Sequence, residues 1–119
     1  MTISGIQLRS SRYQAFDVTL AATKVAGALD KIEDTVGVYF EGGESGDIVA
    51  FVTQADKILL AKKDGSGEAI AQGALVYYEA ASGKLTATAG SNTKCGRCIK
   101  AALPTDTTVL VAFNGLVAA

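Results

Sequence analysis

Short segments in which apolar and polar residues alternate recur along the chain, separated by turns that contain glycine. Phe16 to Leu20 gives the clearest example, with apolar residues at every second position. A period of two residues is typical of strands with one buried face, whereas a helix needs a period of 3.6. The thirteen glycines and the single proline fit tight turns between such strands. The pattern favours an all-β protein.

The spacing of these segments predicts a small β-barrel or β-sandwich with an extended N-terminal arm. The expected strands cover residues 16–20, 35–40, 47–53, 57–62, 75–79, 84–88, 94–102 and 107–113. Residues 21–34 stay open between a helix and an irregular strand, because apolar residues have helical spacing there but Gly27 interrupts them. The length of 119 residues fits one domain, which we assign to residues 16–119, with residues 1–15 as the arm.

The composition argues against several classes of function. The chain has no histidine, so a Ser-His-Asp or Cys-His nucleophile is impossible within it, and we expect no enzymatic activity. A formal net charge of −1 argues against a protein that binds nucleic acid by neutralising phosphates. No apolar run approaches the ~20 residues that span a membrane. The first residues lack the pattern of a secretion signal, so we expect synthesis in a cytoplasm and no membrane partner.

Cys95-Gly96-Arg97-Cys98 is the motif with the most chemical character. The spacing fits a thiol-redox module, but that setting requires a helix after the second cysteine. A zinc site requires about four ligands, and two cysteines without histidine supply half of them. In a straight strand the two thiols would lie on opposite faces with Cα atoms ~10 Å apart, beyond the ~7 Å limit for a disulfide. We therefore expect two small apolar side chains, one of them buried, or, alternatively, an interchain disulfide through Cys95 or Cys98. No cofactor or metal is expected.

Two other clusters have simple interpretations. The acidic residues between Glu41 and Asp47 could bind calcium, but a solvated loop is the favoured interpretation. Gly83-Lys84 resembles the end of a phosphate-binding loop, yet Leu85 stands where Ser or Thr must hold magnesium. Three lysines, Lys57, Lys62 and Lys63, are expected to form a modest basic cluster at the surface.

The stretch from Gly67 to Thr86, GEAIAQGALVYYEAASGKLT, resembles small head proteins of tailed phages. These are the capsid decoration, or head cement, proteins, a family formerly described as a domain of unknown function and sometimes labelled recombinase-like. Further matching residues lie on both sides of this stretch: Gly37-Val38, Ser45 to Val49, Lys62, Asn92-Thr93, Gly96, Ala101-Ala102, Asp106 and Thr108 to Val111. The resemblance covers about residues 36–113. The first 35 residues match poorly, and the cysteine pair replaces residues that are usually apolar.

The resemblance implies a compact β-barrel or sandwich that binds the outer surface of an expanded capsid in the virion. The implied partners are the major capsid protein and neighbouring decoration subunits, often in a homotrimer. Binding across the junctions of the shell would stabilise the capsid lattice.

For the arm, we expect backbone pairing with a capsid strand or a neighbouring subunit, because β-augmentation needs little sequence specificity. The residues expected at this interface are Ile3, Ile6, Leu8, Arg9, Arg12 and Tyr13. A low-copy head fibre-base or adaptor protein is the alternative, and a small thiol-redox module is a third candidate.

Overall fold

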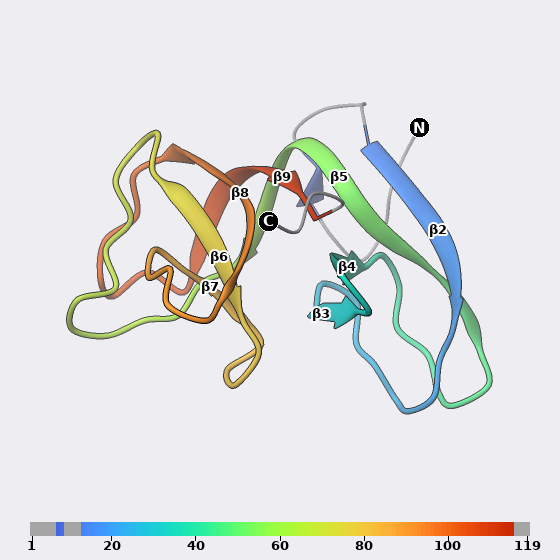
Figure 1. Cartoon of the computed structure of the whole chain (residues 1–119). Helices are drawn as coiled ribbons and strands as arrows, with labels where there is room; N and C mark the ends of the chain where they lie inside the picture. Colours follow the sequence, from blue (N-terminus) through green and yellow to red (C-terminus); the bar gives the residue numbers. More distant parts are fainter. Residues whose placement is uncertain (1–6, 9–12, 116–119) are drawn as a thin grey trace.

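The computed structural model describes residues 7–8 and 13–115, which form one antiparallel β-sheet that curls into a nearly closed barrel (Figure 1). The strands are β1 (Gln7–Leu8), β2 (Tyr13–Thr19), β3 (Leu29–Ile32), β4 (Thr35–Tyr39), β5 (Ile48–Ala61), β6 (Leu75–Glu79), β7 (Lys84–Thr86), β8 (Thr93–Lys100) and β9 (Thr108–Asn114). The described residues form no helix, so none of them belongs to a helix that could span a membrane. The prediction of an all-β fold is confirmed.

Strand β5, with fourteen residues, is the longest strand and pairs with four others. Along one edge β5 pairs with β1 and β2, and along the other it pairs with β4 and β9. Two separate strands, 47–53 and 57–62, were expected here, and that prediction is wrong. The register against β9 shifts between Ala55 and Ile58, and the exposed Asp56 and Lys57 lie at this irregularity. A β-bulge bends a strand without ending it, which explains the interrupted sequence pattern.

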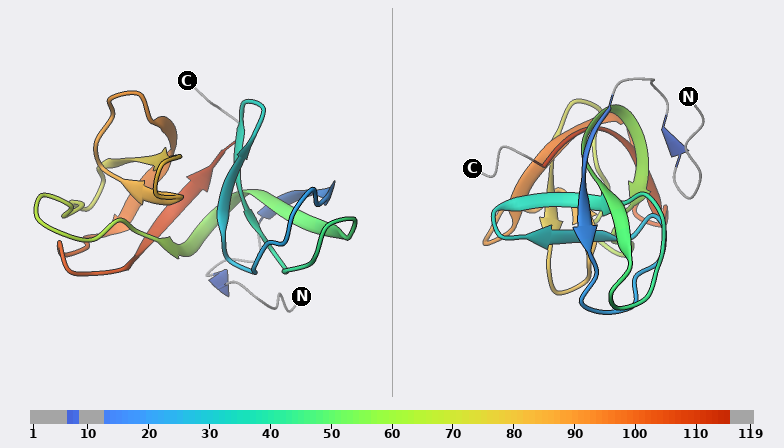
Figure 2. Two further views of the ribbon diagram at one scale, coloured as in Figure 1. Left: turned by 90° about the horizontal axis from the view of Figure 1, so that it is seen from below. Right: turned by 90° about the vertical axis from the view of Figure 1, so that its right-hand side faces the viewer.

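The bend in β5 divides the molecule into two lobes (Figure 2). The N-terminal lobe contains β2, β3, β4 and the first half of β5, and the C-terminal lobe contains β6 to β9 and the second half of β5. In the C-terminal lobe the strands follow the order β5-β9-β8-β6-β7. A parallel bridge between Lys62 and Leu85 then connects the end of β5 to β7. This bridge closes the ring of strands, and the N-terminal lobe extends from it through β5.

Residues 21–34 contain a strand and no helix. Leu29 is buried and lies opposite Val38, so β3 forms a hairpin with β4. Gly27 has a φ of 86°, which an L-residue with a side chain rarely adopts, and its N–H donates to the carbonyl of Tyr39. The turn at Gly27 and the pairing with β4 therefore override the helical spacing of the apolar residues.

The buried apolar side chains form two clusters. The main core runs through both lobes and consists of Leu29, Val36, Val38, Val52, Ala55, Ile58, Leu60, Ile70, Val76, Tyr78, Leu85, Cys95, Cys98, Ala102, Val109, Val111 and Phe113. The N-terminal cluster lies within the N-terminal lobe and consists of Leu20, Tyr39, Val49 and Phe51. The burial of alternate residues in β6 and β9 explains why these strands could be recognised from their sequence.

Candidate functional site

The described parts of the expected arm lie along β5. Leu8 is opposite Ile58, and Tyr13 is opposite Ala55. The other expected interface residues, Ile3, Ile6, Arg9 and Arg12, lie outside the described residues. Residues 13–15 already belong to β2, so the described arm backbone is extended and paired in the same sheet as the domain.

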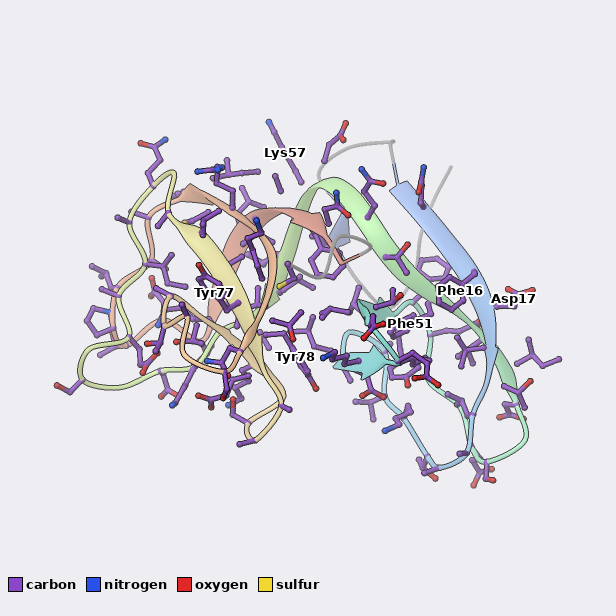
Figure 3. All side chains as sticks on the ribbon, in the orientation of Figure 1. Phe16, Asp17, Phe51, Lys57, Tyr77 and Tyr78 are labelled. Atoms are coloured by element: carbon purple, nitrogen blue, oxygen red, sulfur yellow. The ribbon has the colours of Figure 1, made fainter. Side chains whose placement is uncertain are left out.

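Strand β2 has an open outer edge near the arm. β2 pairs with β5 along one side, and no other described strand pairs with its second side. Figure 3 shows Phe16 on the side of β2 toward Phe51, with Asp17 on the opposite side. The ring centroids of Phe16 and Phe51 are 5.6 Å apart, yet 42% of Phe16 remains exposed. An open edge beside an exposed aromatic ring can accept another strand and bury that ring.

The two cysteines share one face of β8, so the prediction that they lie on opposite faces is wrong. Cys95 and Cys98 are both buried in the main core. The register between β6 and β8 shifts at Cys95: Val76 lies opposite Gly96, but the next residue, Tyr77, lies opposite Lys94. This irregularity at Cys95 changes the alternation, which a count of residues along a straight strand cannot reveal.

The environment of the thiols does not suit redox catalysis. Burial raises the pKa of Cys95 to about 12 and also raises the pKa of Cys98. A reactive thiol requires a lowered pKa, because the thiolate is the nucleophile. The residues that follow Cys98 continue β8 rather than beginning a helix. Both features disfavour the thiol-redox module.

Lys62 is completely buried, so the expectation that it lies at the surface is wrong. Its Nζ donates to the carbonyl oxygens of Lys63 at 2.8 Å, Asp106 at 3.2 Å and Pro104 at 3.4 Å. The ammonium group thus fastens the end of β5 to the turn before β9. Ile58, Leu60 and Lys62 occupy alternate positions, and this alternation was the signal in the sequence that Lys62 points inward.

A polar group borders the N-terminal cluster. The hydroxyl of Tyr39 donates to Asp30 Oδ2 at 2.6 Å, and Lys24 Nζ lies 3.5 Å from the same oxygen. Burial alone would raise the pKa of Asp30, but the hydrogen bonds from Tyr39 and from the N–H of Lys31, with the charge of Lys24, lower it. Burial, followed by the same carboxylate, raises the pKa of Tyr39. This group ties β3 to β4 and to the preceding loop.

None of these groups forms a recognisable catalytic or metal centre. Within residues 7–8 and 13–115, no three metal-ligating side chains converge on one point. The candidate binding features of the described residues are therefore the open edge of β2 and the outer faces of the sheet.

Comparison with known proteins agrees with this description. Residues 10–113 match the family described as phage cement protein. The match covers most of the chain, so the protein belongs to the phage cement proteins and has a structural role associated with the phage capsid. No curated protein matches the chain, and neither does any solved structure.

Proposed function

We propose that this protein binds the outer surface of the expanded capsid and stabilises the lattice of the major capsid protein. The family match over residues 10–113 is the observation that carries this proposal. A ligand that binds only the assembled lattice stabilises it in proportion to the logarithm of its concentration over its Kd. In this proposal the protein is made in the host cytoplasm, has no enzymatic activity, requires no cofactor, and engages neither nucleic acid nor membrane.

The arm is the proposed contact with the shell. Ile3, Ile6, Leu8, Arg9, Arg12 and Tyr13 would lie along a capsid strand or a neighbouring subunit. The open edge of β2 supports this idea, because an incoming strand could pair there without disturbing the barrel.

Deletion of residues 1–12 tests the arm while leaving β2 whole. We expect the truncated chain to fold, as judged by circular dichroism, and to lose co-sedimentation with expanded capsids that lack the protein. Deletion of residues 116–119 is the matched control and should keep binding. Normal binding by the chain without residues 1–12 would refute the role of the arm.

The copy number in purified particles separates decoration from the alternative of a low-copy fibre-base or adaptor protein. Quantitative mass spectrometry should find this chain in an amount comparable to the major capsid protein. A few copies per particle would instead assign it to a vertex, and its absence would refute a role in the virion.

The homotrimer and the interchain disulfide remain predictions. Native mass spectrometry of the isolated protein tests the trimer. Because Cys95 and Cys98 are buried, a disulfide to a neighbouring chain would require β8 to open locally. Electrophoresis of particles without reductant would show dimers or larger species if the bond exists, and monomers with two free thiols if it does not.

A further inference from the structure

Charge is unevenly distributed between the two lobes. Residues 14–53 contain only two basic side chains, Lys24 and Lys31. The same segment contains seven acidic side chains: Asp17, Asp30, Glu33, Asp34, Glu41, Glu44 and Asp47. Residues 80–105 contain no acidic side chain, but they contain four basic ones: Lys84, Lys94, Arg97 and Lys100. The net charge of −1 therefore conceals an acidic end formed by the N-terminal lobe and a weakly basic end formed by the C-terminal lobe, where residues 54–115 contain seven basic and five acidic side chains.

The basic end contains a hollow on the outer face of β6, β8 and β9. This basic hollow has a volume of about 290 Å³ and is lined by Leu75, Lys94, Gly96, Arg97, Ala112 and Asn114. A Cβ at Gly96 would overlap the carbonyl oxygen of Ala112, so only glycine fits there. Because glycine has no side chain, nothing at this position fills the hollow. The hollow thus combines a small apolar floor with two cations at its rim.

The Arg97 side chain is held in place within this hollow. Its Nη1 donates to the carbonyl oxygen of Gly73 at 2.8 Å. A guanidinium group has five N–H donors, so this bond leaves others to bind a carboxylate.

The acidic end finishes in a loop with the complementary character. We define the acidic tip as residues 41–48 together with Val25. Glu41 and Glu44 are exposed, and the apolar side chains of Val25 and Ile48 are each 66% exposed. Gly42 packs against the backbone of residues 24–26, which places Val25 beside this loop.

The acidic tip has a fixed shape. The N–H of Glu44 donates to Asp47 Oδ2 at 2.8 Å, and the N–H of Leu20 donates to the Asp47 carbonyl at 2.8 Å. A bridge between Lys24 and Gly43 ties the loop to the neighbouring segment. The exposed acidic and apolar side chains are thereby presented together on a braced support.

The acidic tip and the basic hollow lie in different lobes, because the tip precedes β5 whereas the hollow lies on β6, β8 and β9. Figure 1 shows the loop before β5 at the end of the N-terminal lobe, far from β8, and Figure 2 agrees. We propose that the acidic tip of one copy docks on the basic hollow of a second copy of this chain. The inference deepens the proposed function, on which it rests, by naming the surfaces through which neighbouring subunits meet on the shell.

The contact uses two different patches and is therefore heterologous. A heterologous contact closes into a ring when its rotation allows and otherwise continues from copy to copy. Exposed ion pairs give little free energy individually, so the isolated contact will be weak. Subunits held on a capsid have a high effective concentration for one another, which makes a weak contact sufficient there.

Zero-length carbodiimide cross-linking tests the contact directly, because it joins a carboxylate to a lysine amine as an amide with loss of water. Equal amounts of ¹⁵N-labelled and unlabelled full-length protein would be cross-linked at low ionic strength. We expect links between Glu41 or Glu44 of one copy and Lys94 of another, suppressed in 1 M salt, where the Debye length falls to about 3 Å. Links between copies that avoid Lys94, or none at all, would overturn the proposal.

Charge reversal provides the second test. K94E/R97E and E41K/E44K should each lower the self-association constant about 10-fold, because like charges then face each other. The chain that carries all four changes should associate again with nearly the original constant. D64K is the matched control, since Asp64 lies in another exposed loop. Reversals that change association no more than D64K does would overturn the inference.

These measurements use the free protein, so they can fail independently of the proposed function. If the protein is abundant on particles but the reversals leave self-association unchanged, decoration stands and the contact between copies falls. If K94E/R97E abolishes capsid binding without changing self-association, the basic hollow contacts the shell instead, and the inference is equally overturned.

Discussion

The main core and the N-terminal cluster differ in size and in the way they are enclosed. The main core contains seventeen buried residues, most of which lie inside the ring of strands that the bridge from Lys62 to Leu85 closes. The N-terminal cluster contains four buried residues and is bounded by β2 and β3, whose outer edges have no partner among the described strands. Local opening costs least where few apolar contacts must be broken. The lobe that carries the arm and the acidic tip is therefore the easier one to deform.

Phe113→Ala should have the largest effect, because it removes a ring that is 1% exposed from the main core. We expect the free energy of unfolding to fall by about 3–5 kcal/mol, the usual cost of truncating a buried Phe to Ala. Urea denaturation followed by circular dichroism measures it. Since the main core runs through both lobes, the whole chain should unfold in one transition at lower urea. A loss below about 1 kcal/mol would show that this core is not the principal source of stability.

Gly37→Ala should disturb the N-terminal cluster instead. A Cβ at Gly37 would overlap the ring of Phe51, which is fully buried between Phe16 and Tyr39. Overpacking of this kind costs about 1–3 kcal/mol. Hydrogen exchange should show faster opening of β2 and β3 and little change in β8 and β9.

The double variant Gly37→Ala/Phe51→Leu controls for the cause. The smaller leucine makes room for the added methyl group. The double variant should therefore lose less stability than the sum of the losses in Gly37→Ala and Phe51→Leu. Strict additivity would mean that Gly37 is required for a reason other than the space that Phe51 occupies.

Lys62→Met tests the closure of the C-terminal lobe. The substitution keeps an unbranched buried chain but removes the donor to three carbonyl oxygens. The Pro104 oxygen keeps its bond from the N–H of Gly65, but the partly buried carbonyl oxygens of Lys63 and Asp106 lose this donor, which should cost about 1–3 kcal/mol. Lys57→Met is the control, since Lys57 is exposed at the bend of β5 (Figure 3) and should change stability by less than about 0.5 kcal/mol. Equal effects of the two substitutions would show that the buried ammonium group has no special role.

Sequence pattern was sufficient for the parts of the fold in which alternation is regular. Strand β6 and the closing strand β9 could be predicted because their buried residues occupy every second position. The continuity of β5 and the shared face of Cys95 and Cys98 could not be predicted, because β-bulges shift the alternation at both places. A bulge depends on the register with the partner strand, and a single strand does not reveal that register.

The candidate surfaces show a similar division. The acidic loop from Glu41 to Asp47 was visible in the sequence as a solvated segment. The basic hollow was not, because Leu75, Lys94 and Ala112 come from three strands that only pairing brings together. The inward position of Lys62 was available from its alternation with Ile58 and Leu60, but the usual preference of lysine for the surface outweighed it.

The smallest expected effect is on the pH dependence of the free energy of unfolding, and it concerns Asp30 beside the N-terminal cluster. The pKa of Asp30 is lowered from its usual value of 3.8 in the folded protein, so the folded state favours the ionised carboxylate. Its contribution is present above the unfolded pKa and is lost as the pH falls through the lower folded pKa. For a partly exposed group the effect should stay below about 1 kcal/mol.

Asp30→Asn keeps an oxygen for the Tyr39 hydroxyl but removes the titration. Urea denaturation between neutral pH and about pH 3 should therefore show a shallower loss of stability in Asp30→Asn than in the unaltered protein. Glu79, whose pKa is also lowered, titrates in both proteins and cancels in the comparison. Parallel pH profiles would show that the bond from Tyr39 to Asp30 does not depend on the charge of Asp30, and that the N-terminal cluster is held by packing alone.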